Sequence, residues 1–424
     1  MRTPDQYIPN IRLSVARNAK LWHTCKALAV SVLLFFSTSP VFAQSGEPVE
    51  QGKPNVPEFK PAFPEQTRVP ASNSGVSPAV ESFTGPLEHP WGMDILPDGS
   101  YLVTERPGRM RVISKNGKLS KPLKGIPEVL AQKQGGLLDV SLGPNFNKDR
   151  MIYWAYSKPL KNGQSATAVA KGRLSGDKSE VTDVEDIFIQ EPSSSTPAHY
   201  GSRILFDGKG HVFITTGEHF TEKERVLSQE LDATYGKVIR INADGSVPED
   251  NPFVDKKEAV GSIWSYGHRN IQGAAFHPKT EQFWVIEHGP QGGDELNLVK
   301  PGANYGWPVV CYGENYDGTP VGSGKARHAG EFTEPRYYWD PVIAPAGAIF
   351  YQGDMFKEWE GDLLISSLTP GGLVRLELNG DTVTGEERLI TDQGRIRDVM
   401  EAPDGSLLLL VDEPDGAVLR LTRK

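Results

Sequence analysis

Hydrophobic and polar positions alternate in short runs along most of this chain, and a turn separates the runs of each pair. Six such units begin at Trp91, Leu137, Ser202, Gly273, Gly347 and Arg397. Each unit has an apolar strand, a turn containing Pro, Asp or Gly, and a second apolar strand, which is the pattern of a β-hairpin. The turns recur at intervals of roughly 50 to 75 residues. Helix-periodic patterns are scarce and are limited to the surroundings of residues 223–234.

A repeat of this length that contains only strands is typical of propeller blades, because helical solenoids have shorter repeats with helical periodicity. We therefore predict an all-β protein, a six-bladed β-propeller closed into one ring. A pair of β-sandwiches is the alternative, and the even spread of the repeats along the chain disfavours it. In a propeller, the loops between strands meet around a central channel, so polar loop residues from distant parts of the sequence converge there.

Two segments precede the repeats. Residues 1–43 combine basic residues, an apolar run from Ala27 to Phe36 and a final Val41-Phe42-Ala43, which together predict a cleaved secretory signal peptide. An uncleaved membrane anchor is the alternative, but the apolar run is too short to span a bilayer. Residues 44–78 are rich in proline and predict an extended lead-in, which leaves 79–424 as the propeller domain. We expect a periplasmic or secreted protein whose mature chain has no membrane span.

Composition narrows the function classes. The chain has 424 residues, 38% hydrophobic and 23% charged, with a formal net charge of −9. These values suit a soluble globular protein and argue against a nucleic-acid partner. Once the predicted signal is removed, Cys311 is the only cysteine, so no internal disulfide can form and we interpret it as a buried packing residue. The sequence contains no nucleotide-binding glycine loop, HExxH zinc pattern, CxxC pair or GxSxG elbow.

The segments 264–273 (WSYGHRNIQG) and 287–308 (EHGPQGGDELNLVKPGANYGWP) carry the densest set of chemical groups. Their glycines allow backbone groups to approach a ligand closely, and Arg269 beside Asn270 would fix its orientation. We interpret this region as the floor of a binding site for a charged small molecule. The carbonyls of Gly289 and Pro290 are oxygen ligands of the kind that Ca²⁺ takes, although carbonyls in turns are common.

His199 lies in a loop just before a predicted strand, where a histidine is either a general base or a hydrogen-bonded structural residue. Glu218, at the end of a following strand, would orient this histidine or be a solvated loop carboxylate. Gln134 precedes two glycines and a strand, so its amide either binds a ligand or belongs to a plain turn.

Arg395 and Arg397 alternate at the start of a predicted strand, so their side chains share one face. Two guanidinium groups on one face require an anion. A ligand carboxylate would supply it in a bidentate manner, and pairing with Asp398 or another nearby acid is the alternative.

Several motifs together, in this order, resemble the soluble quinoprotein sugar dehydrogenases, and more closely their periplasmic aldose sugar dehydrogenase branch. The motifs are WGMDILPDG, ERPGRMRVI, QGGLLDV, HYGSRILFD, GKVIRINADGSVPEDNPF, WSYGHRN, EHGPQGGDELN, NYGWP and GRIRDV. The resemblance covers nearly everything from about Pro61 to the C-terminus. It implies a six-bladed propeller that binds pyrroloquinoline quinone (PQQ) and calcium in its central cleft.

This resemblance also implies the roles of individual residues. His199 would be the catalytic base, and Glu218 would be an active-site acid. The cofactor would be held by Gln134, Arg269, Asn270, Arg395 and Arg397, and the carbonyls of Gly289 and Pro290 would ligate calcium. The implied reaction oxidises an aldose sugar at C1 to a lactone by hydride transfer and passes the electrons to an external acceptor.

One residue departs from the family pattern, because Thr369 stands where glucose-type members have a lysine that contacts the cofactor. Two other functions are open: a calcium-dependent propeller hydrolase of the lactonase type, and a non-catalytic propeller that binds glycans or proteins. The hydrolase needs several carboxylate and amide side chains around one metal ion, and the sequence does not display such a set. The binding propeller gives no shared role to His199 and the arginines. The preferred aldose, the physiological acceptor and the oligomeric state are not encoded in these motifs.

Overall fold

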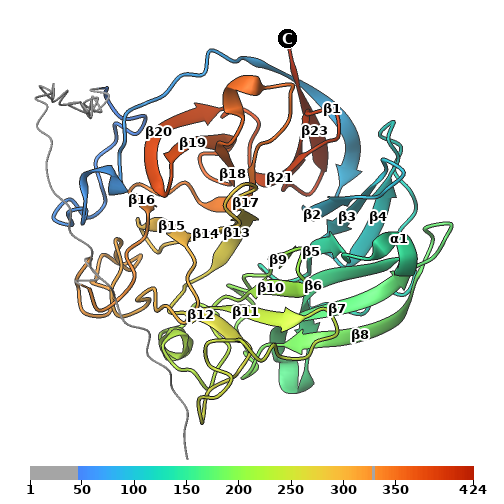
Figure 1. The fold of residues 1–424 in the computed structure, drawn as a ribbon, viewed down its shortest axis with the longest axis horizontal. Helices are drawn as coiled ribbons and strands as arrows, with labels where there is room; N and C mark the ends of the chain where they lie inside the picture. Colours follow the sequence, from blue (N-terminus) through green and yellow to red (C-terminus); the bar gives the residue numbers. More distant parts are fainter. Residues whose placement is uncertain (1–45, 327–329) are drawn as a thin grey trace, which may run out of the picture. The chain divides into compact units, whose positions relative to one another are not determined.

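The computed structural model describes residues 46–326 and 330–424, and these residues form six β-sheets arranged as the blades of one ring (Figure 1). Five sheets of this described part have four strands and one has three. The predicted all-β, six-bladed propeller is therefore confirmed. The predicted signal peptide, residues 1–43, lies outside the described residues. Within the described part, no helix has both the length and the apolar character needed to cross a bilayer.

The blades follow one another along the chain. Blade 1 has β2 (Pro90–Ile95), β3 (Tyr101–Glu105) and β4 (Arg109–Ile113). Blade 2 has β5 (Leu137–Leu142), β6 (Met151–Pro159), β7 (Ser165–Leu174) and β8 (Val181–Ile189), and blade 3 has β9 (Ile204–Phe206), β10 (His211–Thr215), β11 (Lys237–Asn242) and β12 (Ile263–Tyr266). Blade 4 has β13 (Ile271–Phe276), β14 (Phe283–Glu287), β15 (Asp294–Leu298) and β16 (Tyr337–Trp339), and blade 5 has β17 (Pro345–Phe350), β18 (Leu363–Ser367), β19 (Leu373–Asn379) and β20 (Thr382–Leu389). Blade 6 has β21 (Ile396–Glu401), β22 (Leu407–Val411), β23 (Gly416–Arg423) and β1 (Pro78–Leu87).

The six predicted hairpins are the first two strands of the six blades. The first strands lie innermost, since β2 contacts both β5 and β21, and β17 contacts both β13 and β21. The described helices have only three or four residues each. They are α1 (Phe146–Asp149), α2 (Glu222–Arg225), η1 (Pro64–Gln66), η2 (Lys161–Gly163), η3 (Val226–Ser228) and η4 (Lys357–Trp359). The helix-periodic stretch around residues 223–234 thus forms only α2 and η3.

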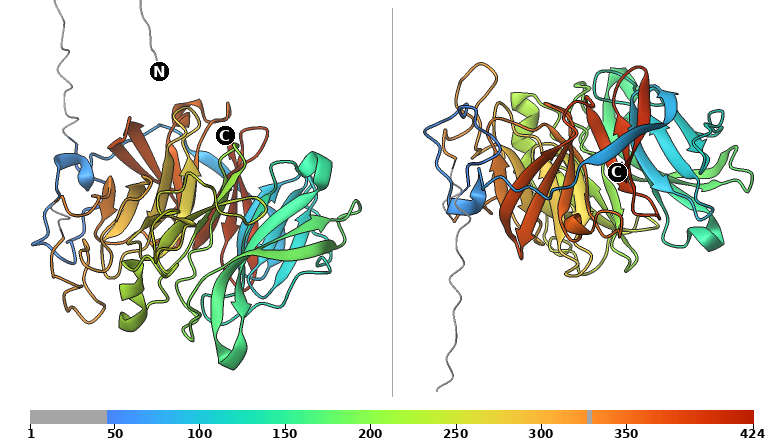
Figure 2. Two further views of the ribbon diagram at one scale, coloured as in Figure 1. Left: turned by 60° about the horizontal axis from the view of Figure 1, so that its bottom comes forward. Right: turned by 90° about the horizontal axis from the view of Figure 1, so that it is seen from above.

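The ring closes because the strand that precedes blade 1 completes blade 6. Strand β1 pairs antiparallel with β23, in a register that runs from Pro78 opposite Arg423 to Leu87 opposite Gly416. This pairing joins the two ends of the propeller and covers an edge that would otherwise be open to other strands. Figure 2 shows the closing strand beside β23 when the blades are seen from the side.

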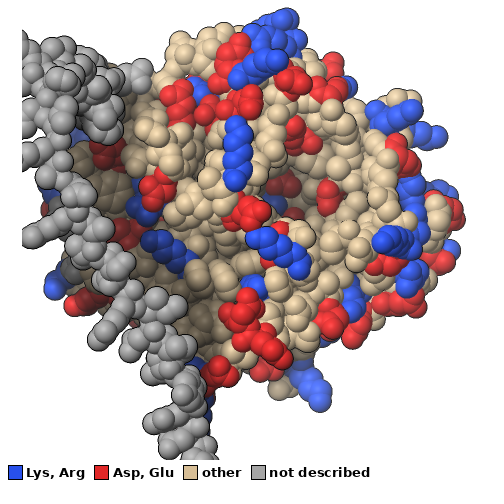
Figure 3. Space-filling view, viewed as in Figure 1, with Lys and Arg blue, Asp and Glu red and all other residues tan. Residues whose placement is uncertain are grey.

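The core is divided among the spaces between neighbouring blades. Strand β22 shows how one strand serves two such spaces. Leu407 and Leu409 pack towards blade 5, whereas Leu408 and Leu410 pack towards blade 1. A strand buried on both faces reads as a continuous apolar run, which explains the sequence LLLL. Charged side chains of both signs are interspersed over the face in Figure 3.

The proline-rich lead-in runs along blades 4 and 5 from residue 46 onward. Asp340, just after β16, accepts hydrogen bonds from the backbone N–H of Asn55 (2.9 Å) and of Val56 (3.0 Å). The Gln66 side chain is fully buried and donates to the carbonyl of Pro335 at 2.9 Å. Phe59 packs beside a small cluster of Tyr312, Ala326 and Tyr338. The lead-in is therefore held by specific contacts with the propeller.

Candidate active site

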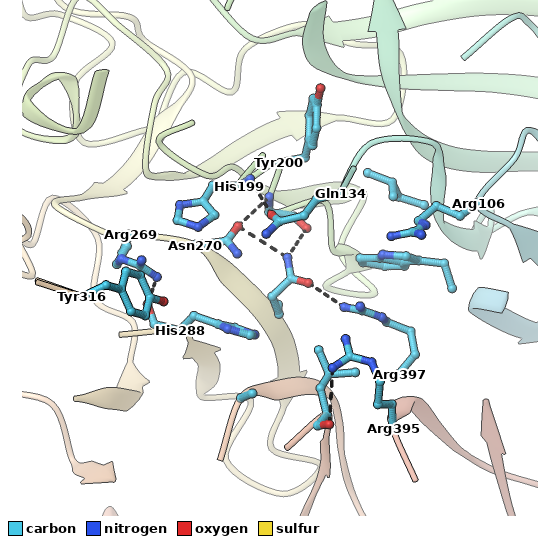
Figure 4. A pocket seen from close by; sticks show the side chains of 16 residues that line it. Arg106, Gln134, His199, Tyr200, Arg269, Asn270, His288, Tyr316, Arg395 and Arg397 are labelled. Atoms are coloured by element: carbon cyan, nitrogen blue, oxygen red, sulfur yellow. Dashed lines mark hydrogen bonds between the residues drawn. The ribbon is translucent and has the colours of Figure 1, made fainter. Parts of the chain in front are cut away.

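One pocket of about 210 Å³ lies where all six blades meet (Figure 4). Its walls are Trp91, Arg106, Gln134, Leu138, His199, Tyr200, Gly201, Arg269, Asn270, Gln272, His288, Tyr316, Ala344, Leu368, Arg395 and Arg397. Several of these residues lie just before the innermost strand of a blade: Asn270 and Arg395 immediately precede β13 and β21, and His199 lies in the loop that leads into β9. Each first strand begins on the same side of the ring, so short entry loops from distant parts of the chain converge there.

The pocket brings together six of the nine site residues predicted from the sequence. They are Gln134, His199, Arg269, Asn270, Arg395 and Arg397. Glu218 lies behind His199 and does not line this pocket. Gly289 lines a smaller adjoining cavity that shares Arg269 and His288 as walls with the main pocket, and Pro290 lines neither cavity.

His199 and Glu218 form a buried pair at the wall of the pocket. His199 Nδ1 lies 3.3 Å from Glu218 Oε1, with side-chain exposures of 6% and 1%. This is an ion-pair distance, but both atoms lack a well-aligned hydrogen bond. The backbone holds both residues, because the His199 N–H donates to Gln134 Oε1 (2.8 Å) and the Glu218 N–H donates to the Arg269 carbonyl (3.1 Å). The Gln134 amide therefore positions the histidine.

Burial lowers the pKa of His199, and the charge of Arg269 lowers it further, although Glu218 opposes both effects. Burial alone would raise the pKa of Glu218, but the charges of His199 and Arg269 hold that pKa below its ordinary value. At neutral pH the imidazole is therefore neutral and the carboxylate is ionised. With Nδ1 turned towards Glu218, the Nε2 lone pair is available to accept a proton from a ligand in the pocket.

Four arginines line the pocket, and no Asp or Glu appears among its described walls. Arg397 Nη2 lies 2.6 Å from Asp412 Oδ2, and its Nη1 donates to Gln272 Oε1 at 2.9 Å. Arg395 Nη2 is 3.9 Å from the same carboxylate oxygen. The alternative that a nearby acid pairs with these arginines therefore holds for Arg397, and the acid that pairs with it is Asp412. Asp398 instead pairs with Arg203, at 3.0 Å.

Arg269 is a buried guanidinium with unused hydrogen-bonding capacity. Its Nη1 donates to the His288 carbonyl at 3.1 Å, and its Cζ atom lies 5.2 Å from the centroid of the Trp307 ring. Its Nε lies 3.9 Å from Glu218 Oε1 and has no hydrogen-bond partner. Leaving a buried charged donor without a hydrogen bond is costly, and the Glu218 carboxylate is the charged group that faces this Nε.

The sequence reasoning missed Arg106, His288 and Tyr316. Arg106 directly follows the innermost hairpin of blade 1 in the motif ERPGR, and its position after β3 was a usable signal. His288 adjoins Gly289, and its Nε2 lies 2.7 Å from the carbonyl of Pro345. Burial, together with the charges of Arg269 and Arg397, lowers the pKa of His288 to about 3, so this imidazole is neutral.

The surroundings of Gly289 contain several backbone oxygens. A Cβ atom at this glycine would lie 2.3 Å from the carbonyl oxygens of Gly292 and Gly293, so only glycine fits this turn. The Gly289 N–H donates to Asp294 Oδ1 at 2.7 Å. Residues 46–326 and 330–424 contain no group of three or more His, Cys, Asp or Glu side chains arranged to hold a metal ion.

Cys311 is buried against Trp307 and Val321, and burial raises the pKa of its thiol to about 12. The interpretation of Cys311 as a packing residue is therefore confirmed.

Fold and site together define a six-bladed propeller with a buried histidine–carboxylate pair beside an arginine-lined pocket. The family model described as "Glucose / Sorbosone dehydrogenase" matches residues 87–420. The chain belongs to this family and is a sugar dehydrogenase, which is an oxidoreductase.

Two relatives illustrate the similarity in sequence. The chain is 43% identical over 345 residues to aldose sugar dehydrogenase YliI of Escherichia coli (strain K12), covering 81% of this chain and 92% of the relative. It is 26% identical over 405 residues to quinoprotein glucose dehydrogenase B of Acinetobacter calcoaceticus, covering 77% and 83%.

Solved structures show the same fold. The soluble aldose sugar dehydrogenase of Escherichia coli, in its apo form, superposes with a TM-score of 0.79 at 42% identity, covering 82% of this chain and all of that chain. The PQQ-bound form of an aldose sugar dehydrogenase from Streptomyces coelicolor superposes with a TM-score of 0.67 at 26% identity, covering 82% and 99%.

Proposed function

We propose that this protein is a PQQ- and calcium-dependent aldose dehydrogenase, active in the periplasm or outside the cell. It oxidises aldose sugars at C1 to lactones and passes the electrons to an external acceptor. One observation carries this proposal: the buried, neutral base His199 faces the same pocket as four guanidinium groups, of which, among the described residues, only Arg397 is closely paired with a carboxylate, that of Asp412. The Escherichia coli relative is named an aldose sugar dehydrogenase, and the Streptomyces coelicolor relative has a PQQ-bound form.

The donors of the pocket fit PQQ, which carries three carboxylates. Arg269, Arg395 and Arg397 would hold these carboxylates, with Asn270 and the free amide N–H groups of Gln134 at the rim. The guanidinium of Arg269 lines the pocket, where such an anion would meet it. When bound, PQQ supplies the quinone that accepts a hydride and therefore two electrons.

Calcium binding would depend on the anionic cofactor. Four guanidinium groups repel a bare divalent cation, so Ca²⁺ would enter together with carboxylate oxygens. The carbonyls of Gly289 and Pro290 would supply protein oxygens from the adjoining turn, as hard ligands that Ca²⁺ accepts. There the ion would act as a Lewis acid.

His199 would remove the proton from the C1 hydroxyl while the hydride leaves C1, so that the C1–O bond becomes the carbonyl of the lactone. Its Nε2 atom is the acceptor, because Nδ1 faces Glu218. Glu218 would hold the imidazole in this tautomer and stabilise the imidazolium that forms. Glu218 is therefore a positioning residue, separated from the substrate by the ring that it orients.

The test is reconstitution of the purified apoprotein with PQQ and Ca²⁺, followed by a dye-reduction assay with a panel of aldoses. The proposal requires dye reduction that depends on both additions and on the sugar. Hydrolysis of a lactone in the absence of quinone would instead identify a propeller hydrolase. Binding of glycans in the absence of both activities would identify a non-catalytic binding propeller.

A further inference from the structure

Phe220 places an exposed aromatic ring directly beside the imidazole of His199. The two ring centroids are 5.2 Å apart and the planes are 86° apart, an edge-to-face contact. Phe220 also stacks with Tyr316, one of the pocket walls, with centroids 6.4 Å apart and planes 29° apart. Phe220 is 48% exposed and Tyr316 is 63% exposed. The two rings thus form an apolar rim next to the proposed base.

The backbone at Phe220 is held in a conformation that bulky residues avoid. Its φ is 79°, and the preceding His219 has a φ of 61°, so two consecutive side chains lie in the left-handed region. A fully buried anchor maintains this turn, because His219 Nε2 lies 2.8 Å from Gln190 Oε1 and Nδ1 lies 3.1 Å from the Thr196 carbonyl. The N–H of Phe220 donates to the carboxylate of Glu218.

One rigid turn therefore presents two groups to His199. Glu218 points inward and meets Nδ1 of the imidazole, whereas the Phe220 ring meets the same imidazole from the solvent side. The packing of the propeller does not require the Phe220 ring, since in the described part of the chain it belongs to none of the hydrophobic clusters between blades. A strained backbone that holds an exposed apolar ring beside a proposed base points to contact with a ligand.

We propose that Phe220 is a substrate-binding residue whose ring receives the apolar C–H face of an aldose ring, while the C1 hydroxyl of that sugar lies at His199. This inference rests on the proposed function. A sugar ring presents C–H groups on its faces and hydroxyl groups at its edge, so an aromatic wall holds the face and leaves the edge free for polar contacts. Phe220 is not among the walls of the cationic pocket, so it contacts the sugar and leaves the cofactor to the arginines.

The principal test compares Phe220→Ala with the wild type after reconstitution with PQQ and Ca²⁺. We expect the KM for D-glucose, or for the best aldose found, to rise about tenfold, because the sugar would no longer bury its C–H face against the aromatic ring. The kcat should change by less than about twofold, and the PQQ concentration that gives half-maximal activity should stay unchanged. Phe220→Tyr, which keeps the ring, should retain the wild-type KM.

A second readout does not depend on turnover. 1,5-Anhydro-D-glucitol has the pyranose ring but no C1 hydroxyl, so it binds the sugar site without being oxidised. Its dissociation constant, measured by titration calorimetry on the loaded enzyme, should rise about tenfold in Phe220→Ala. Val226→Ala is the matched control, because Val226 is an equally exposed apolar residue (49%) in the same segment and does not line the pocket. It should leave both constants unchanged.

The outcomes are distinct. An unchanged KM and an unchanged affinity for the analogue in Phe220→Ala overturn the inference and leave the proposed function intact. A raised PQQ requirement at constant sugar KM also overturns it, since Phe220 would then contact the cofactor. If the loaded wild type oxidises no aldose, the proposed function fails and the inference falls with it. Should Phe220→Ala fold poorly, Phe220→Leu keeps the apolar bulk without the aromatic face and should still raise the KM severalfold.

Discussion

The Nδ1 atom of His199 lies 3.3 Å from Oε1 of Glu218, and both side chains are buried at the wall of the central pocket. The two residues flank the open end of the innermost hairpin of blade 3, His199 in the loop before β9 and Glu218 in the turn after β10. The pairing of these strands therefore fixes the distance between the proposed base and its carboxylate. It also leaves Nε2 as the atom that can accept a substrate proton.

Replacing His199 by Gln should lower kcat by roughly 10²-fold or more. Glutamine keeps much of the shape of the histidine side chain, but its amide cannot act as a base. The PQQ concentration needed for half-maximal activity should change little, since the arginines hold the cofactor. His277→Gln, which alters a histidine outside the pocket, should leave turnover unchanged. Normal turnover of His199→Gln would remove the base assignment.

The rate should depend on pH through His199. Burial and Arg269 lower the pKa of this imidazole, so kcat/KM should stay level as pH falls from neutrality and decline only below the ordinary histidine range. Glu218 raises the pKa of His199, so Glu218→Gln should move this decline to still lower pH as well as slowing turnover. Profiles of kcat/KM against pH for both proteins measure the shift, and a move to higher pH would contradict it.

The two arginines at β21 should respond differently to substitution by Ala. Arg397 is buried and paired with Asp412, whose side chain is 4% exposed, so Arg397→Ala leaves a buried carboxylate without its main partner. This change should cost about 3 kcal/mol of unfolding free energy as well as weakening PQQ binding. Arg395 is 43% exposed, so Arg395→Ala should raise the PQQ requirement with little change in stability. Chemical denaturation and PQQ titration separate the two effects, and equal losses of stability would contradict this account.

Thr369→Lys should lower the PQQ concentration needed for activity. Thr369 is exposed and follows Leu368, a pocket wall whose carbonyl lies 3.5 Å from Arg395 Nη1. A lysine there would add a cation at the rim of the pocket, worth up to about tenfold in affinity for a tricarboxylate. Thr369→Met, which has similar length without charge, is the control. An equal effect of both variants would show that the charge is not responsible.

The six hairpins were predictable because the signal is local. Strands that bury one face carry an apolar pattern with a period of two residues, strands that bury both faces carry a continuous apolar run, and the turns between them need Gly, Asp or Pro. The entry loops were predictable as a group for the same reason, since any propeller gathers them at one side of the ring. Gln134, His199, Arg269, Asn270, Arg395 and Arg397 accordingly line one pocket.

The tertiary structure decided what no local pattern contains. It placed Glu218 behind His199, selected Asp412 as the partner of Arg397, and closed the ring by pairing β1 with β23. It also brought Tyr316, which lies in the sequence between β15 and β16, to the wall of the pocket beside Phe220. The pairing of β1 with β23 and the contact of Tyr316 with Phe220 join residues that are far apart in the chain, whereas the His199–Glu218 and Arg397–Asp412 contacts depend on how strands pair within one blade. The hydrophobic pattern along the sequence thus determines the strands of each blade, whereas strand pairing and loop packing in three dimensions determine which polar groups meet.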